Sequence, residues 1–331
     1  MTCGMLAPMQ LKSIALLTAG GDAPGMNPCV RAVVRTTLAL GMRAFGIRRA
    51  YEGLVGGDIA EVGARDVGGI IQRGGTILQT ARFPDFAKIE VQQDALRQLR
   101  AKGVDALVAI GGDGTMRGAA ALQKLGFPVV GVPASIDNDV FGTDISIGVD
   151  TALNTILDAI DKLRDTASSH RRAFIVETMG RNCGHLALMS GIISGAEMIL
   201  IPEQEAGAEE VAEAVRGAHA RGKTHAIVVV SEGAKLGANA LKEKLDRMNT
   251  GFDFRVTILG HVQRGGSPSA WDRLIAARLG VAAVERLHKG ENGVMVGLKA
   301  PDIIGTALAE VASRQRAPDL EYYRMARMLA K

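Results

Sequence analysis

The sequence is poor in cysteine, in aromatic residues and in long apolar runs. Three cysteines in 331 residues are too few and too scattered for a disulfide framework. Their scarcity excludes a disulfide-stapled secreted domain and is typical of a reducing cytosol. Aromatic residues make up 4% of the chain and leave few platforms for stacking bases, so nucleic acid is not expected as a partner.

No apolar run approaches the roughly 18 residues that a membrane span needs. The longest candidate, 186–201, is interrupted by Gly191, Gly195 and Glu197. The first dozen residues lack a basic start and an apolar core, so they are predicted to be a loose extension and not a signal peptide. A membrane is therefore not expected as a partner, and a cytoplasmic location is predicted.

The composition that remains is that of a globular protein, with 47% hydrophobic and 22% charged residues. The formal net charge of +4 suits anionic ligands. The length allows two domains of ordinary size, each with its own core.

The most informative stretch runs from Ala106 to Asp139. Two short apolar runs, Ala106–Ile110 and Pro128–Val132, each stop at small and acidic residues, a pattern that predicts buried parallel strands. Residues 116–125 between them are expected to form a helix. Because the carboxyl ends of parallel strands share one edge of an open α/β sheet, both following loops are expected where ligands bind.

The first of these loops is Gly111-Gly112-Asp113-Gly114-Thr115. Its glycines let backbone N–H groups approach a phosphate at the positive end of the next helix. Asp113 suits Mg²⁺, which takes one or two carboxylates and keeps phosphate oxygens as further ligands. A tight turn without function is the alternative interpretation.

The second loop is Ser135-Ile136-Asp137-Asn138-Asp139. In an extended segment Asp137 and Asp139 leave the same face. Two adjacent carboxylates are unfavourable unless a metal, a cation or a substrate proton compensates them. A pair of Asx turns is the alternative, but the two loops together favour phosphoryl transfer.

Further strand, loop and helix units precede and follow this stretch. The first strand leads into a glycine-rich loop, but the G-x-G-x-x-G spacing is absent, so a dinucleotide site is not favoured. Residues 165–170 are expected to end the long helix before them. The expected strands are 13–18, 44–47, 173–176, 226–230 and 256–259, and the expected helices are 27–40, 65–72, 148–164, 269–288 and part of 317–331.

Strands of the second half also end in polar and cationic groups. Glu232 suits a sugar hydroxyl, while His261 and Arg264, accompanied by glycines, suit a sugar phosphate. The arginine fork matches phosphate oxygens in pairs, which lysine cannot do. The histidines 170, 185, 219 and 288 have no metal-ligand spacing and are interpreted as structural.

Taken in order, these motifs resemble those of the bacterial-type ATP-dependent 6-phosphofructokinases. The resemblance extends from about Ser13 to about Gly297. It rests on TAGGDAPGMN (18–27), QTARFPDF (79–86), IGGDGT (110–115), SIDND (135–139), ETMGRNCGH (177–185), SEG (231–233) and GHVQRGGSP (260–268).

The resemblance implies an α/β fold of two Rossmann-like three-layer domains with mostly parallel sheets. Residues 1–147 plus 260–310 would form the ATP-binding domain, and residues 148–259 plus 311–331 the sugar-phosphate domain. The implied reaction transfers the γ-phosphate of ATP, with Mg²⁺, to the 1-hydroxyl of fructose 6-phosphate in glycolysis. The implied assembly is a homotetramer.

For the nucleotide, the resemblance implies contacts from Gly21, Arg82, Phe83 and the 112–115 loop. Asp137 is expected to be the catalytic base, with Arg82, Arg181 and Ser135 at the transferred phosphate, and Asp113 and Asp139 at Mg²⁺. Ser135 replaces a threonine that is common in the family. Ala87 departs from a basic residue that often contacts the nucleotide.

For the sugar phosphate, the implied contacts belong to both domains, and Arg172 and Arg255 would reach the active site of a neighbouring subunit. The full set is Ser135, Ile136, Asp137, Arg172, Met179, Gly180, Arg181, Glu232, Arg255, His261 and Arg264.

A regulatory site for ADP or phosphoenolpyruvate is also implied. Its expected residues are Arg31, Arg35, Arg164, Glu197, Lys223 and His225, while Ala64 and Thr224 depart from basic residues of the family.

Small residues at Gly114 and Ala134 favour ATP over pyrophosphate, because pyrophosphate-using relatives typically carry Asp and Lys there. The alternatives kept open are a pyrophosphate-dependent phosphofructokinase and, more remotely, an NAD- or lipid-kinase-like enzyme or a non-catalytic nucleotide sensor.

Overall fold

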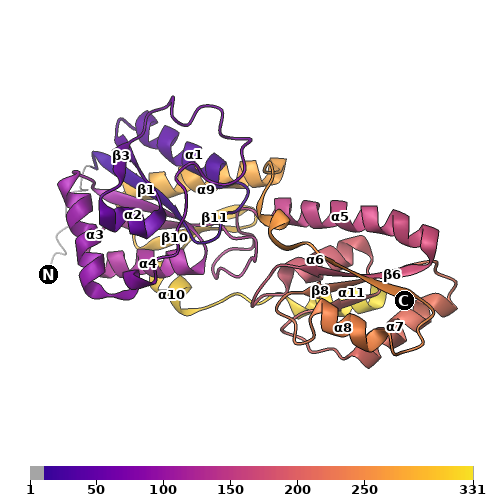
Figure 1. The fold of residues 1–331 in the computed structure, drawn as a ribbon. Coiled ribbons are helices and arrows are strands. Elements are labelled where there is room, and N and C mark those ends of the chain that lie inside the picture. Colours follow the sequence, from indigo (N-terminus) through magenta and orange to yellow (C-terminus); the bar gives the residue numbers. More distant parts are fainter. Residues whose placement is uncertain (1–10, 331) are drawn as a thin grey trace. The chain divides into compact units, whose positions relative to one another are not determined.

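The structure, a computed structural model, describes residues 11–330. Most of the expected N-terminal extension lies outside the described residues. By its internal contacts the chain divides into two compact units (Figure 1). The first comprises the chain up to residue 135, 140–148 and 264–315, and the second comprises 136–139, 149–263 and the chain from 316.

The first unit is built on a seven-stranded sheet. Its strands are β1 (Ser13–Ala19), β2 (Arg43–Ile47), β3 (Ile59–Glu61), β4 (Ala106–Gly111), β5 (Val129–Pro133), β10 (Val294–Lys299) and β11 (Asp302–Ala307). The strand order is β11-β10-β5-β4-β1-β2-β3. The five inner strands run parallel, and β3 and β11 close the two edges antiparallel.

Helices cover both faces of this sheet and complete three layers (Figure 1). One face carries α1 (Met26–Ala39) and α9 (Ala270–His288), which pack on each other. The other carries α2 (Ala50–Gly56), η1 (Pro84–Ala87), α3 (Ile89–Ala101), α4 (Asp113–Lys124) and α10 (Leu308–Ser313). Residues of β1 and β4 are buried along their whole length, which explains their continuous apolar sequences.

The second unit has a four-stranded sheet of order β7-β8-β6-β9, parallel throughout. The strands are β6 (Arg172–Thr178), β7 (Met198–Leu200), β8 (Ala226–Ser231) and β9 (Asp253–Ile258). The helices α5 (Val149–His170), α6 (His185–Ser194) and α11 (Leu320–Leu329) gather on one face, and α7 (Ala208–Ala220) and α8 (Ala238–Leu245) on the other. The short η2 (Gly260–Arg264) follows β9.

The expected α/β class with mostly parallel sheets is confirmed, but two expected elements are wrong. Residues 65–72 form turns instead of a helix, because Gly68 and Gly69 interrupt the segment and Gly68 N–H closes a turn onto the Arg65 carbonyl at 3.0 Å. Helix α5 continues to His170 instead of ending at Arg164. In residues 11–330, no helix combines the length and the apolar character that a membrane crossing requires.

Candidate active site

The glycine loop after β4 is shaped by close backbone contacts. A Cβ atom at Gly111 would lie 2.3 Å from the carbonyl oxygen of Ala19 in the neighbouring strand, so no side chain fits there. Gly112 is the N-cap of α4 and its carbonyl accepts the Thr115 N–H at 2.9 Å. The Thr115 hydroxyl donates to the Ala19 carbonyl at 3.1 Å. These contacts present the first turn of α4 at the carboxyl edge of the sheet, where a helix N-terminus attracts anions.

Asp113 is the first residue of α4. Its side chain is 11% exposed and forms an ion pair with Arg117, one turn further along the helix, at 2.6 Å. The Asp113 carboxylate therefore lies next to the glycine loop, and the Arg117 guanidinium lies beside it.

A cavity of about 390 Å³ opens beside this helix turn. Tyr51 and Phe86 stack on its wall with ring centroids 4.2 Å apart, and Gln92 donates to the Phe86 carbonyl at 2.8 Å. Residues from four segments line it, among them Gly20, Arg82, Phe83, Ala87, Gly114 and Thr115. The lining combines apolar and aromatic side chains with the glycine loop and Arg82, a combination that fits a ligand with a flat ring and a phosphate tail.

Gly21 and Arg264 meet in the first unit. The Arg264 guanidinium donates to the Asp22 carbonyl at 3.3 Å, and a Cβ atom at Gly21 would lie 1.9 Å from its Nη1. Because Gly21 has no side chain, the Arg264 guanidinium can occupy the space beside it.

Ser135 lies beside the glycine loop, because β4 and β5 are neighbours. A Cβ atom at Gly112 would be 3.6 Å from the Cβ of Ser135. The Ser135 N–H donates to the Ile147 carbonyl at 3.1 Å. This contact fixes the backbone of Ser135 at the same edge of the sheet as the first turn of α4.

The segment Ile136–Asp139 belongs to the second unit. Ile136 and Asn138 are each 1% exposed, and Asn138 adopts the left-handed conformation with φ of 54°. The Asp139 carbonyl accepts the Arg316 N–H at 2.9 Å. The turn that carries Asp137 and Asp139 is thus fixed at its centre and at its end.

The carboxyl edge of the second sheet gathers several expected substrate residues. The Met179 N–H donates to Oε1 of the buried Gln263 at 3.2 Å, and the Ser231 hydroxyl donates to the Gly180 carbonyl at 3.0 Å. The Glu232 N–H donates to the Thr178 carbonyl at 2.8 Å. A Cβ atom at Gly233 would lie 1.9 Å from the Arg181 carbonyl. These bonds hold residues 179–181 against the loop of Glu232, while His261 is exposed in η2.

Arg172 and Arg255 lie near the amino ends of β6 and β9, away from this edge. Both face Asp253, Arg255 at 2.8 Å and Arg172 at 4.0 Å. Within the second unit Arg172 and Arg255 therefore lie near each other and apart from Arg181 and Glu232.

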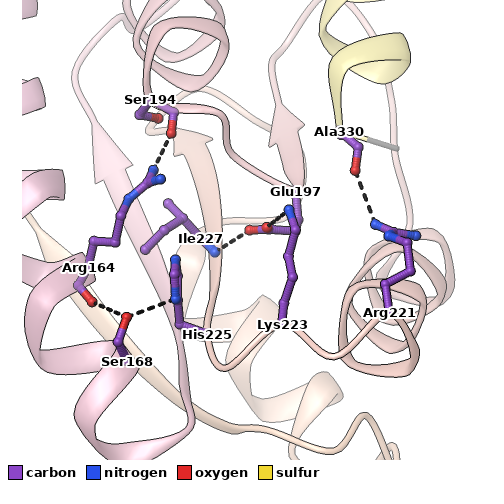
Figure 2. A network of polar contacts seen from close by, with 9 residues as sticks. All are labelled: Arg164, Ser168, Ser194, Glu197, Arg221, Lys223, His225, Ile227 and Ala330. Atoms are coloured by element: carbon purple, nitrogen blue, oxygen red, sulfur yellow. Dashed lines mark hydrogen bonds and ion pairs between the residues drawn. The ribbon is translucent and has the colours of Figure 1, made fainter.

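A second cavity, of about 320 Å³, lies in the second unit and is lined by Arg164, Glu197, Lys223, Thr224 and His225. Figure 2 shows the polar network around it. Lys223 and the Ile227 N–H both bind the buried Glu197 carboxylate, at 2.8 and 2.6 Å.

The remaining groups of this network are also held by hydrogen bonds (Figure 2). Arg164 donates to the Ser194 carbonyl, and Ser168 lies 2.9 Å from His225 Nδ1. Burial lowers the pKa of His225. The structure therefore groups four of the six expected effector residues, whereas Arg31 and Arg35 lie on α1 of the first unit.

Sequence reasoning missed Tyr51, Phe86, Gln92 and Gln263, and it set His185 aside as structural. Gln263 stands inside a quoted motif, between His261 and Arg264, and that position could have drawn attention to it. Tyr51 has no such signal, because only its side chain reaches from α2 to α4, where its hydroxyl donates to the Thr115 carbonyl.

The phosphofructokinase family profile matches residues 13–287 of the chain. The ATP-dependent 6-phosphofructokinase of Halalkalibacterium halodurans is 48% identical over 320 residues, covering 97% of this chain and 100% of the relative. The ATP-dependent 6-phosphofructokinase 1 of Thermus thermophilus is 50% identical over 321 residues, with the same coverage.

The crystal structure of Pichia pastoris phosphofructokinase in the T-state superimposes with a TM-score of 0.88 at 35% identity. That match covers 95% of this chain and 36% of the Pichia chain. With a family profile across most of its length and full-length relatives at about half identity, the chain belongs to the phosphofructokinase family.

Proposed function

We propose that this chain is an ATP-dependent 6-phosphofructokinase of glycolysis, acting in the cytoplasm. It transfers the γ-phosphate of ATP to the 1-hydroxyl of fructose 6-phosphate and yields fructose 1,6-bisphosphate and ADP. The observation that carries the proposal is the glycine loop at the start of α4, which opens into a cavity with an apolar wall in a chain about half identical to enzymes of that name.

In this proposal the adenine end of ATP occupies the cavity near the Tyr51–Phe86 stack, with Phe83 beside it. Gly21 and residues 112–115 take the phosphates. Arg82, exposed at the rim, compensates charge on the transferred group.

Magnesium fits the residues present. No group of three or more His, Cys, Asp or Glu side chains that could hold a metal occurs within residues 11–330, so a cage made of protein alone is not formed. Mg²⁺ is usually bound through one or two carboxylates, with phosphate oxygens and waters completing its shell, and Asp113 and Asp139 would supply these. When bound, the ion neutralises phosphate charge.

Asp137 is the proposed general base. It accepts the proton of the 1-hydroxyl as that oxygen meets the phosphate, a role typically worth about 10²–10⁴ in rate. Ser135 holds the moving phosphate through its hydroxyl, and Arg181 balances the added negative charge. Most of the acceleration is expected from positioning and charge stabilisation, because the transition state of phosphoryl transfer is loose.

The sugar is held through its own groups. Glu232 accepts hydrogen bonds from hydroxyls, and His261 and Arg264 bind the 6-phosphate, with Ile136, Met179 and Gly180 beside it. Arg172 and Arg255 lie near the amino ends of β6 and β9, where each faces Asp253. In this proposal they bind the 6-phosphate in a neighbouring subunit of a homotetramer.

ATP is the proposed donor rather than pyrophosphate. A Cβ atom at Gly114 meets nothing within 4 Å, and this residue lines the cavity. A larger acidic side chain there would enter the space proposed for the nucleotide and repel its phosphates.

The cavity in Figure 2 is the proposed effector site, for ADP or phosphoenolpyruvate. Arg164 and Lys223 supply its positive charge, with His225 beside them, although Lys223 is already paired with Glu197. Arg31 and Arg35 would complete the site from α1.

Product identification tests the proposal. The protein is incubated with Mg·ATP and fructose 6-phosphate, and equal amounts of fructose 1,6-bisphosphate and ADP are expected. Parallel reactions replace ATP by pyrophosphate, or replace the sugar phosphate by NAD. Activity with pyrophosphate alone, or phosphorylation of NAD alone, would refute the proposal, and mass photometry would test the tetramer.

A further inference from the structure

Asn138 lies between the two acidic residues of the 135–139 loop and is itself buried, with 1% of its surface exposed. Its φ of 54° places it in the left-handed region, which is uncommon for residues other than glycine and which asparagine tolerates better than most. The direction in which Asp137 and Asp139 leave the backbone depends on this conformation.

The side-chain amide of Asn138 contacts the imidazole ring of His185. Its Nδ2 lies 3.2 Å from Nε2 of His185, at the start of α6. Because an amide Nδ2 can only donate, Nε2 is the acceptor, and the imidazole must be neutral with its proton on Nδ1. Burial and the nearby charge of Arg316 lower the pKa of His185 to about 4, which favours this neutral form.

The helix start that carries His185 is itself anchored. The Gly184 N–H donates to the Glu203 carboxylate at 2.9 Å. A Cβ atom at Gly180 would lie 2.4 Å from the Cys183 carbonyl, so the chain turns tightly there. Burial, together with the charges of Glu203, Asp139 and Asp137, raises the pKa of Cys183 to about 12.

We propose that His185 is a positioning residue for phosphoryl transfer, holding the Asn138 amide so that Asp137 is presented in one orientation. The role rests on the proposed function of Asp137 as the base. His185 does not touch the reacting atoms in this proposal. It acts through Asn138, and its effect is therefore on kcat more than on the binding of fructose 6-phosphate.

The test compares His185→Leu with His185→Gln. Leucine removes the acceptor, while the glutamine carbonyl reaches about as far as Nε2 and can accept the same hydrogen bond. His185→Leu is expected to lower kcat by about 10- to 100-fold with KM for fructose 6-phosphate within about threefold. His185→Gln is expected to stay within about threefold of the wild type in kcat.

Ser190→Ala is the matched control, because Ser190 is a buried polar residue of the same helix whose hydroxyl bonds only within α6. It should lose stability without the loss of kcat. Wild-type kcat in His185→Leu, or an equal loss in His185→Leu and His185→Gln, would overturn the proposal. Lack of product from the wild-type protein would instead refute the proposed function.

Asn138→Gly supplies a second route if His185→Leu does not fold. Glycine accepts the left-handed backbone but lacks the amide. A fall in kcat similar to that of His185→Leu, with no further fall in the double variant, is expected. Hydrogen exchange of residues 135–140, a readout independent of turnover, should rise in Asn138→Gly and in His185→Leu but not in His185→Gln. Unchanged kcat in Asn138→Gly, or unchanged exchange, would overturn the proposal.

Discussion

The Tyr51 hydroxyl donates a hydrogen bond of 2.7 Å to the carbonyl of Thr115. The ring reaches this carbonyl because residue 118, one turn further along α4, is glycine: a Cβ atom there would lie 2.6 Å from the Tyr51 ring. A side chain of α2 therefore fixes the first turn of α4, from which the glycine loop presents its N–H groups.

Gly118→Ala should push Tyr51 away from this position. We expect a loss of about 1–3 kcal/mol in the free energy of unfolding, as in other overpacked cores, and a raised KM for ATP. Chemical denaturation and steady-state kinetics measure the two effects. Gly56→Ala in α2, where an added Cβ meets nothing within 4 Å, is the control and should change stability by less than about 1 kcal/mol. Equal behaviour of the two variants would contradict the prediction.

Asp137→Ser should lower kcat by about 10²–10⁴-fold while leaving the binding of both substrates nearly intact. The expected result follows from the loss of a group that acts on the proton in the transition state. Initial rates and isothermal titration with fructose 6-phosphate check it. A variant with near-normal kcat would remove Asp137 from the role of base.

Gly114→Asp should impair the use of ATP without unfolding the protein. Space is open around the Cβ position, so the fold is expected to tolerate the change, whereas the added carboxylate would face the phosphates. We expect KM for ATP to rise by about tenfold or more, with thermal stability nearly unchanged. An unaltered KM for ATP would show that the nucleotide does not pass this residue.

Lys223→Met should leave the buried Glu197 carboxylate without its cation. The side chain of Glu197 is 4% exposed and that of Lys223 is 41% exposed, so we expect a loss of about 1–2 kcal/mol in stability after solvent screening. Lys235→Met removes one partner of an exposed pair at 3.0 Å and should cost less than about 1 kcal/mol. Equal losses, measured by urea denaturation, would contradict the prediction.

The pKa of His185, lowered to about 4 from 6.5, predicts a dependence of stability on pH. Between these values the unfolded chain binds a proton that the folded chain does not, so the free energy of unfolding falls as the pH is lowered through this window. The expected contribution is about 1–3 kcal/mol. His185→Gln should remove that part of the pH dependence, and parallel curves for the two proteins, measured by denaturation from about pH 7 to about pH 5, would count against it.

The sequence predicted the parallel strands well because both sheets bury their inner strands on two faces, so that continuous apolar runs mark them. It predicted the end of α5 wrongly. The polar residues at 165–170 suggested a break, but Ser168 and Ser169 return their hydroxyls to the carbonyls of Arg164 and Asp165, at 3.0 and 3.2 Å, and remain within the helix.

The candidate site was predictable where glycines and charged residues follow strands, as at Gly112, Asp113 and Glu232. The site was not predictable where a residue reaches it only through tertiary packing. Tyr51 enters from α2, and the partner of His185 is 47 residues away in sequence. Neither the distance between Asn138 and His185 nor the protonation state of His185 can be inferred from their spacing along the chain.

Gly21 is an exposed loop residue, yet the atom that an added methyl group would strike is the end of a long side chain, Nη1 of Arg264. The Arg264 side chain can adopt another rotamer, so a substitution at Gly21 should leave folding intact and displace the Arg264 guanidinium. In a mutational scan, position 21 would therefore be intolerant for activity while remaining permissive for expression, the opposite of what surface location alone suggests.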